Sequence, residues 1–97
     1  MLSSPLPMPR IKITVYGLVQ GVGFRYHTRQ QALSQNLTGY VKNRPNTTVE
    51  IVADGPEENI RSLVQWVRQG PARARVDRIE VETCLPINRF DSFIIER

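Results

Sequence analysis

The chain has 97 residues, of which 40% are hydrophobic and 23% are charged, and these values are typical of one globular domain. The single cysteine, Cys84, excludes an intrachain disulfide and a zinc site built from cysteines, and it favours a reducing, cytoplasmic setting. A net charge of +4 is too small to indicate a nucleic-acid-binding protein by itself, and no apolar stretch approaches the ~20 residues that span a bilayer.

A leader, a strand and a helix are predicted in the first third of the chain. Residues 1–9 contain three prolines and no apolar core, so we predict a flexible leader rather than a signal peptide, followed by a single domain over residues 10–97. Apolar and polar residues alternate over residues 10–16, which is the period of a half-buried strand. A connection with three glycines follows at residues 17–23. Residues 24 to about 36 lack glycine and proline, which favours a helix.

Two further strands and a second helix are predicted in the middle of the chain. Residues 38–42 and 49–53 have strand character, and Pro45-Asn46-Thr47 between them supplies the turn of a hairpin. A helix opens at residues 54–58, where a proline and two glutamates suit the first turn, and ends at Gly70-Pro71. Its apolar face is formed by Ile60, Leu63, Val64 and Val67.

The remaining chain predicts a strand at residues 78–83 and a short fifth strand at residues 93–95. The order β-α-β-β-α-β is the split β-α-β arrangement of ferredoxin-like folds, an α+β class with two helices on one face of a mostly antiparallel sheet. In this topology the first two strands run parallel on either side of the third. Their C-terminal ends then lie at one edge of the sheet, together with the 17–23 connection, the start of the first helix and Asn43. We expect a ligand site at this edge.

The glycine-rich connection and the distribution of charge both favour an anionic ligand. Gly21 and Gly23 allow positive φ and a close approach of backbone N–H groups, and the helix that follows presents unpaired N–H groups at its start. Arg25 in the first turn adds a guanidinium fork that can bind two phosphate oxygens. Residues 1–49 contain six basic residues and no acidic ones, whereas all nine acids lie in residues 50–97. Alternatively, the glycines only make the turn, Arg25 is a solvated surface residue, and the charge distribution is chance in a short chain.

Two stretches of the chain resemble the signature motifs of the acylphosphatase family. The first is VYGLVQGVGFRY at residues 15–26, and the second is LTGYVKN at residues 37–43, followed by VEI at residues 49–51. Shorter matches at residues 55–57 and 74–76 extend the resemblance over most of the chain. Two separate motifs in the right order make the resemblance specific.

The resemblance implies a small free-standing enzyme that hydrolyses acyl phosphates, the mixed anhydrides of a carboxylate and phosphate, without a metal or another cofactor. It places the phosphate-binding arginine on Arg25 and the water-orienting asparagine on Asn43. The phosphate-binding loop falls on Gln20, Gly21, Val22, Gly23 and Phe24. These roles agree with the chemistry, because phosphoryl transfer depends mainly on positioning and on neutralising charge. Since Asn43 is not a base, the proton of the attacking water is expected to go to the substrate phosphate.

Two departures from the family pattern concern loop shape and stability. The hairpin turn reads Asn46-Thr47, where the family commonly carries Asp-Gly. Threonine is a poor residue for positive φ, so we expect a different turn type or length. Residues 93–97 lack the closing aromatic often seen in the family, which would loosen the last strand.

Four other residues have side chains that could carry chemistry. We expect His27 to be structural or exposed, Arg29 to lie on a solvated helix face, and Trp66 to pack beside the core. Cys84 has no nearby histidine in the sequence, so we expect a small packed residue rather than a nucleophile. No spacing of acidic residues and histidine indicates a metal site.

Two other functional classes stay open besides the enzyme. One is a non-catalytic phosphate or acyl-phosphate binder on the same loop. The other is a nucleic-acid-binding module, which needs aromatic residues exposed on the central strands. Tyr40 is the only aromatic expected near such a place, among Lys12, Thr14, Val49, Ile51 and Ala53.

The length of the chain also bears on the kind of enzyme that we expect. Hydrogenase-maturation carbamoyltransferases carry an acylphosphatase-like domain, but 97 residues leave no room for the rest of such an enzyme. We therefore expect a free-standing, monomeric, cytoplasmic enzyme that acts on a small acyl phosphate. We expect no nucleic-acid or membrane partner.

Overall fold

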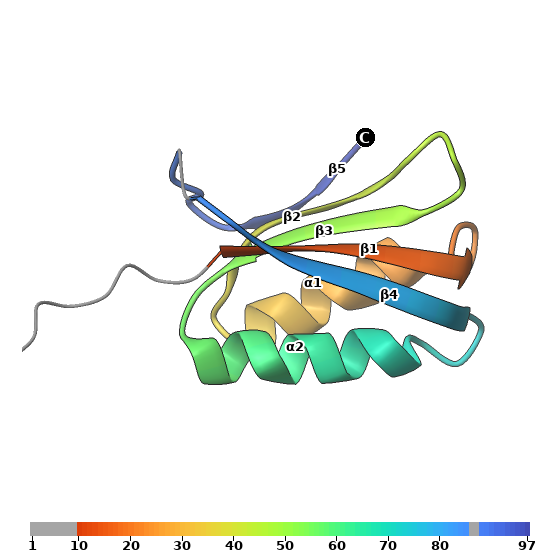
Figure 1. Cartoon of the computed structure of the whole chain (residues 1–97), viewed down its shortest axis with the longest axis horizontal. Helices are drawn as coiled ribbons and strands as arrows, with labels where there is room; N and C mark the ends of the chain where they lie inside the picture. The colour runs from red at the N-terminus through yellow and green to blue at the C-terminus, as the bar shows by residue number, and fades with distance from the viewer. Residues whose placement is uncertain (1–9, 86–87) are drawn as a thin grey trace, which may run out of the picture.

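The computed structural model describes residues 10–85 and 88–97, and the predicted leader at residues 1–9 lies outside them. Five strands form one sheet, and two helices cover one of its faces (Figure 1). The elements in chain order are β1 (Arg10–Leu18), α1 (Phe24–Ser34), β2 (Thr38–Asn43), β3 (Val49–Asp54), α2 (Glu57–Gln69), β4 (Arg75–Cys84) and β5 (Phe93–Glu96). The predicted α+β, ferredoxin-like order of elements is confirmed, including the short fifth strand.

The strand order β4-β1-β3-β2-β5 places β3 between β1 and β2. Both neighbours pair with β3 in antiparallel fashion, so β1 and β2 run parallel to each other, as the topology predicts. At one edge β4 pairs antiparallel with β1, and at the other edge β5 pairs parallel with β2. The C-terminal ends of β1, β2 and β5 consequently lie at the same end of the sheet.

The β1–β4 pair is longer than the sequence predicts. Strand β4 begins at Arg75 rather than at Arg78, and β1 continues to Leu18 through an irregularity at Tyr16/Gly17. A Cβ on Gly17 would collide with the backbone oxygen of Arg75, so only glycine lets the two strands approach this closely. The extra length depends on a partner strand distant in sequence, which the local pattern does not reveal.

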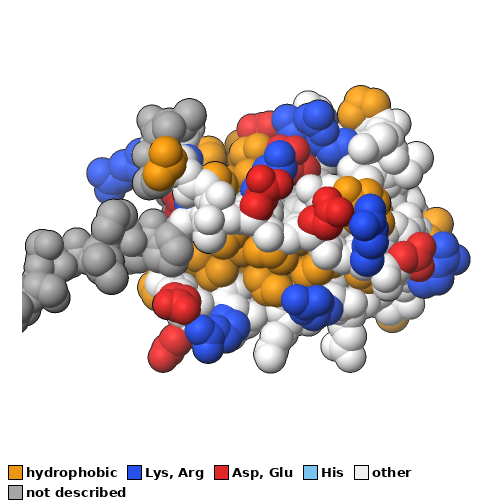
Figure 2. Space-filling model, in the orientation of Figure 1, with side chains coloured by type: hydrophobic (Ala, Val, Ile, Leu, Met, Phe, Trp, Pro, Cys, Tyr) orange, Lys and Arg blue, Asp and Glu red, His pale blue; other side chains and the backbone are white. Residues whose placement is uncertain are grey.

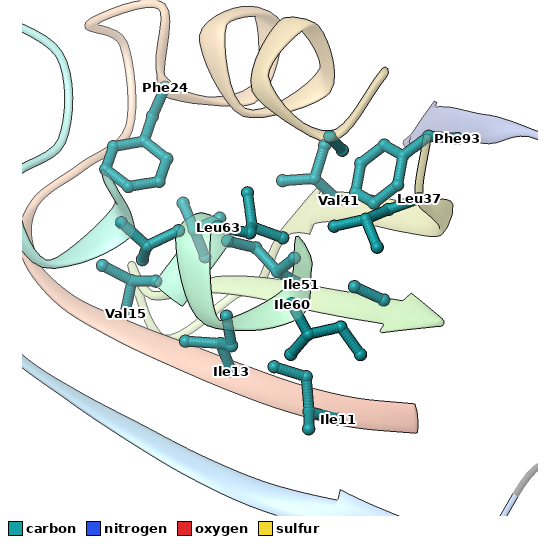
Figure 3. Packing of buried hydrophobic residues seen from close by; sticks show 14 of the residues in the cluster. Ile11, Ile13, Val15, Phe24, Leu37, Val41, Ile51, Ile60, Leu63 and Phe93 are labelled. Atoms are coloured by element: carbon teal, nitrogen blue, oxygen red, sulfur yellow. The ribbon is translucent and has the colours of Figure 1, made fainter. Parts of the chain in front are cut away.

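The hydrophobic core lies between the sheet and the helices (Figure 3). It is formed by alternate residues of the central strands and by the apolar face of α2, including Ile11, Ile13, Val15, Val49, Ile51, Ala53, Ile60, Leu63 and Val67. The expectation that Val49, Ile51 and Ala53 lie on the exposed face of the sheet was therefore wrong, because these three side chains are fully buried. Their neighbours Glu50 and Val52 lie on the opposite face.

Both helices end where a residue adopts a positive φ. Helix α1 stops at Ser34 rather than near Asn36, because Asn36 has a φ of 56° and cannot continue the helix. The backbone N–H of Leu37 then returns to the carbonyl of Ala32 at 2.9 Å, which closes the helix end. Helix α2 ends before Gly70, as predicted. Neither helix is long and apolar enough to cross a membrane within the described residues.

Candidate active site

A cavity of about 180 Å³ lies at the end of the sheet where β1, β2 and β5 finish. Figure 1 shows the β1–α1 connection and the β2–β3 hairpin at this same end. The lining residues come from the connection, the first turn of α1, the end of β2 and the C-terminal residues: Val19, Gly21, Gly23, Phe24, Arg25, Tyr26, Asn43, Ile95 and Arg97. Val19 and Phe24 are buried and form its base, whereas Tyr26 and Arg97 are exposed at its rim.

Residues of the β1–α1 connection and of the first turn of α1 line this cavity. Gly21 and Gly23 have φ values of 77° and 78°, which lie in the left-handed region that other residues rarely adopt. Gly23 caps α1, and the first helical bond runs from the N–H of His27 to the carbonyl of Gly23. The N–H groups before His27 in the first turn therefore have no helical acceptor and are suited to bind an anion.

Arg25 is half-buried in the first turn of α1 and lines the cavity. Within the described part of the chain, no carboxylate forms an ion pair with it. Its guanidinium can therefore bind a ligand without breaking an existing pair. Arg25 is the only one of the six basic residues in the first half of the chain that lines the cavity. Three of the other five pair with acids of the second half, in the pairs Arg10–Asp54, Lys42–Glu96 and Arg44–Glu50.

Asn43 is the last residue of β2 and faces the same cavity. Its Oδ1 atom is buried and has no hydrogen-bond partner among the residues that the structure describes. A buried acceptor left unpaired costs about 1–3 kcal/mol, which a donor arriving with the ligand would recover. The predicted meeting of Asn43 with the glycine-rich connection and Arg25 is confirmed.

Two residues of the predicted phosphate-binding loop, Gln20 and Val22, do not line the cavity. The side-chain amide of Gln20 donates from Nε2 to the carbonyls of Arg44 and Thr48, both at 2.9 Å. Val22 packs against the hydrophobic core. Only the backbone of these two residues is left for an anion.

Four lining residues, Val19, Tyr26, Ile95 and Arg97, are not among the site residues that the sequence predicts. Tyr26 follows Arg25 directly and could have been included with it. Ile95 and Arg97 reach the cavity because β5 pairs in parallel with β2, with Val41 opposite Ile95. The sequence predicts a fifth strand but not its partner, so these two residues carried no usable signal.

The remaining candidates lie outside the cavity, as expected. His27 is exposed, Trp66 packs with its ring centroid 5.8 Å from that of Phe24, and Arg29 is exposed and donates to the carbonyl of Phe93 at 3.0 Å. Burial raises the pKa of the Cys84 thiol, which makes it a weaker nucleophile at neutral pH. Among the described residues, no group of three acidic, histidine or cysteine side chains is placed to hold a metal ion.

Comparison with known proteins identifies the family. The family model described as acylphosphatase matches residues 11–95. The chain belongs to the acylphosphatase family. An acylphosphatase of Geobacter metallireducens is 48% identical over 84 residues, which cover 87% of this chain and 90% of that protein. An acylphosphatase of Yersinia pseudotuberculosis is 49% identical over 82 residues, which cover 84% of this chain and 88% of that protein.

The fold agrees with this membership. The crystal structure of acylphosphatase from Bacillus subtilis superposes with a TM-score of 0.89 at 39% identity, covering 93% of this chain and all of that one. The family resemblance predicted from the two sequence motifs is therefore confirmed, and the chain is a hydrolase of the acylphosphatase type.

Proposed function

We propose that this enzyme hydrolyses acyl phosphates to a carboxylate and inorganic phosphate, without a metal ion. A water molecule oriented by Asn43 attacks the phosphorus in line with the leaving carboxylate. Arg25 and the backbone N–H groups of residues 20–24 hold the phosphoryl group. The observation that carries the proposal is the unpaired amide oxygen of Asn43, buried beside an arginine that has no carboxylate partner in the described chain.

Arg25 and the loop serve the phosphoryl group in different ways. The guanidinium offers two parallel N–H donors to two phosphoryl oxygens, and such charge-assisted bonds are about twice as strong as neutral ones. The free N–H groups at the start of α1 point at the same anion and are reinforced by the helix dipole. Both contacts stabilise charge on the equatorial oxygens, where it is carried in the transition state.

Asn43 orients the water without acting as a base. Its amide oxygen accepts one hydrogen bond from the water, and this contact fixes the direction of attack. None of the nine lining residues is an aspartate, glutamate or histidine, so none of these side chains is placed as a general base among the described residues of the cavity. The proton of the attacking water therefore passes to a phosphoryl oxygen. The carboxylate departs as a stable anion and needs no general acid.

The size of the cavity suits a small reacting group. Its volume of about 180 Å³ equals that of roughly six liquid waters at ~30 Å³ each. A phosphoryl group and one water fit within this space. The acyl group then extends over the rim, past Tyr26 and Arg97, which are both exposed. We infer a broad preference for small acyl phosphates.

The enzyme is further proposed to act as a cytoplasmic monomer with one domain over residues 10–97. One chain brings Arg25, Asn43 and the glycine-rich connection together at the cavity, which supports a site that works within a single subunit.

The outer face of the sheet disfavours nucleic acid as a partner, because Lys12 lies opposite Glu82, Lys42 lies opposite Glu50, and the hydroxyl of Tyr40 donates to Glu50 at 2.6 Å. Figure 2 shows acidic and basic side chains interspersed over the visible surface above α2. A phosphate backbone would meet carboxylates on this face.

Hydrolysis of benzoyl phosphate in the presence of EDTA tests the proposal. We expect turnover by the wild type that EDTA leaves unchanged. Arg25→Ala should abolish turnover, and Asn43→Ala should lower kcat by about 10²-fold or more. Arg61→Ala is the matched control, because Arg61 is an exposed arginine of α2 that pairs with the equally exposed Glu57. Binding of inorganic phosphate by a folded wild type without turnover would instead establish the non-catalytic binder.

A further inference from the structure

Gln20 connects the phosphate-binding loop to the hairpin that carries Asn43. Its Nε2 atom donates to the carbonyl oxygens of Arg44 and Thr48, each at 2.9 Å. Because both neighbours are acceptors, only the NH2 end of the amide can face them, and both of its hydrogens are used. The side chain therefore has no donor left for a phosphate.

The two carbonyls that accept these bonds enclose the turn of the hairpin. The N–H of Arg44 donates to the carbonyl of Thr48 at 2.8 Å, and the N–H of Thr47 donates to the carbonyl of Arg44 at 3.1 Å. The side chain of Gln20 adds two further hydrogen bonds to this turn. Asn43 directly precedes Arg44, and Gly21 directly follows Gln20, so the bridge joins the two segments one residue away from each side of the cavity.

We propose that Gln20 is a positioning residue that sets the distance between the phosphate-binding loop and Asn43. The inference rests on the proposed function, since it concerns the alignment of the attacking water with the phosphoryl group. In residues 10–85 and 88–97, no other side-chain hydrogen bond links residues 19–23 to residues 43–48. A displacement of about 1 Å between reacting groups is enough to cost about 10²-fold in rate. Loss of the bridge should therefore impair catalysis while leaving the phosphate contacts in place.

The variant Gln20→Met tests this role, because methionine has a similar length and no donor. We expect kcat for benzoyl phosphate to fall by at least about 10-fold, whereas the inhibition constant of inorganic phosphate changes by less than about twofold. Gln65→Met is the matched control, since Gln65 is exposed on α2, and it should leave both constants unchanged. A parallel loss of phosphate affinity and kcat would overturn the proposal, because it would make Gln20 a phosphate ligand.

A double-mutant cycle separates positioning from a general structural role. In an Asn43→Ala background, Gln20→Met should have no further effect on kcat, because the residue that it positions is already absent. If the effect of Gln20→Met is as large in this background as in the wild type, Gln20 does not act through Asn43 and the proposal is wrong.

Folding and activity are checked separately. If circular dichroism shows that Gln20→Met does not fold, Gln20→Asn replaces it in the cycle. Its amide is one methylene too short to reach both carbonyls, so the same loss of kcat and the same coupling are expected. Absence of turnover by the folded wild type would contradict the proposed function itself, whereas wild-type turnover with additive effects in the cycle would overturn only the role of Gln20.

Discussion

Arg25 and the Oδ1 atom of Asn43 have no protein partner in the described chain, whereas several other arginines form ion pairs. Arg10, Arg44 and Arg78, for example, lie beside the carboxylates of Asp54, Glu50 and Glu80. A ligand that bound a paired arginine would have to displace a carboxylate. The two polar groups that we propose to contact the substrate and the water are therefore groups without a protein partner in the described chain.

Lysine should not replace arginine at position 25. Arg25→Lys keeps the positive charge but loses the planar fork that binds two oxygens at once. We expect kcat/KM for benzoyl phosphate to fall by about 10- to 100-fold, which corresponds to one lost charge-assisted hydrogen bond. Near wild-type activity of Arg25→Lys would show that charge alone is sufficient.

Arg97 at the rim should affect substrates that carry a second negative charge. It lines the cavity and is exposed, and none of the ion pairs of the described residues includes it. Arg97→Ala should raise KM up to about fivefold for an acyl phosphate with a second carboxylate, the scale of a solvent-exposed ion pair. Benzoyl phosphate, which lacks that carboxylate, serves as the control substrate. An equal change of KM for both substrates would exclude this role.

Within a single element, the β2–β3 hairpin, the backbone is strained at Thr47. The sequence predicts an altered turn because Thr47 stands where glycine is favoured, and in the structure Thr47 has a φ of 72°. Asn46 supports the turn by accepting a hydrogen bond from the hydroxyl of Thr48 at 2.6 Å. The chain thus keeps a tight turn beside Asn43 although its sequence is not suited to it.

The predicted loosening of β5 is not seen in the pairing, since β5 is paired with β2 and Phe93 is fully buried.

Glycine at the β2–β3 turn should stabilise the protein. A left-handed conformation costs a residue with a Cβ about 1–2 kcal/mol, and the greater flexibility of glycine in the unfolded chain offsets part of the gain. We expect Thr47→Gly to raise the free energy of unfolding by about 0.5–1 kcal/mol in urea titrations. Thr83→Gly on the exposed part of β4 is the control and should lower it. A decrease for Thr47→Gly would mean that the turn is not strained.

At the scale of the whole molecule, Arg10 connects several segments at the end of the sheet opposite the cavity. Its guanidinium donates to both carboxylate oxygens of Asp54 and to the side chain and backbone of Asn88, and it lies 4.4 Å from the ring centroid of Phe90. The hydrogen bond to Asp54 raises the pKa of Arg10 above its ordinary value. Arg10 is only 5% exposed, so these contacts replace its hydration. They join β1 and β3 to the segment that leads into β5.

Removal of the Asp54 carboxylate should lower the free energy of unfolding and leave kcat unchanged. Asp54→Ala leaves a buried guanidinium with part of its partners missing, and we expect a loss of about 3 kcal/mol and a decrease of Tm by at least about 10 °C. The value of kcat at a temperature where the variant is folded should be unchanged, since Arg10 begins β1 and the cavity lies beyond its end. Glu57→Ala, which breaks an exposed pair with Arg61, should change Tm little. A small effect of Asp54→Ala would show that other contacts retain Arg10.

Patterns of residues that are close in the sequence predicted the secondary structure. Alternation and helical spacing are local, so the strands and helices followed from the sequence. The meeting of Asn43 with the loop before α1 followed from the order of these elements, because the split β-α-β topology brings the two strand ends together. Individual side-chain contacts between distant segments could not be predicted. The partner of Arg10 lies 44 residues away, and the amide of Gln20 bonds to carbonyls 24 and 28 residues away. Such contacts depend on register and on side-chain reach, which no local pattern encodes.

Isotope labelling distinguishes attack of water on the phosphorus of an acyl phosphate from attack on its carbonyl carbon. Benzoyl phosphate would be hydrolysed in water enriched in oxygen-18, with EDTA present, and both products analysed by mass spectrometry. We expect one labelled oxygen in the inorganic phosphate and none in the benzoate. Label in the benzoate would mean attack at the carbonyl carbon, which would contradict the roles of Arg25 and Asn43.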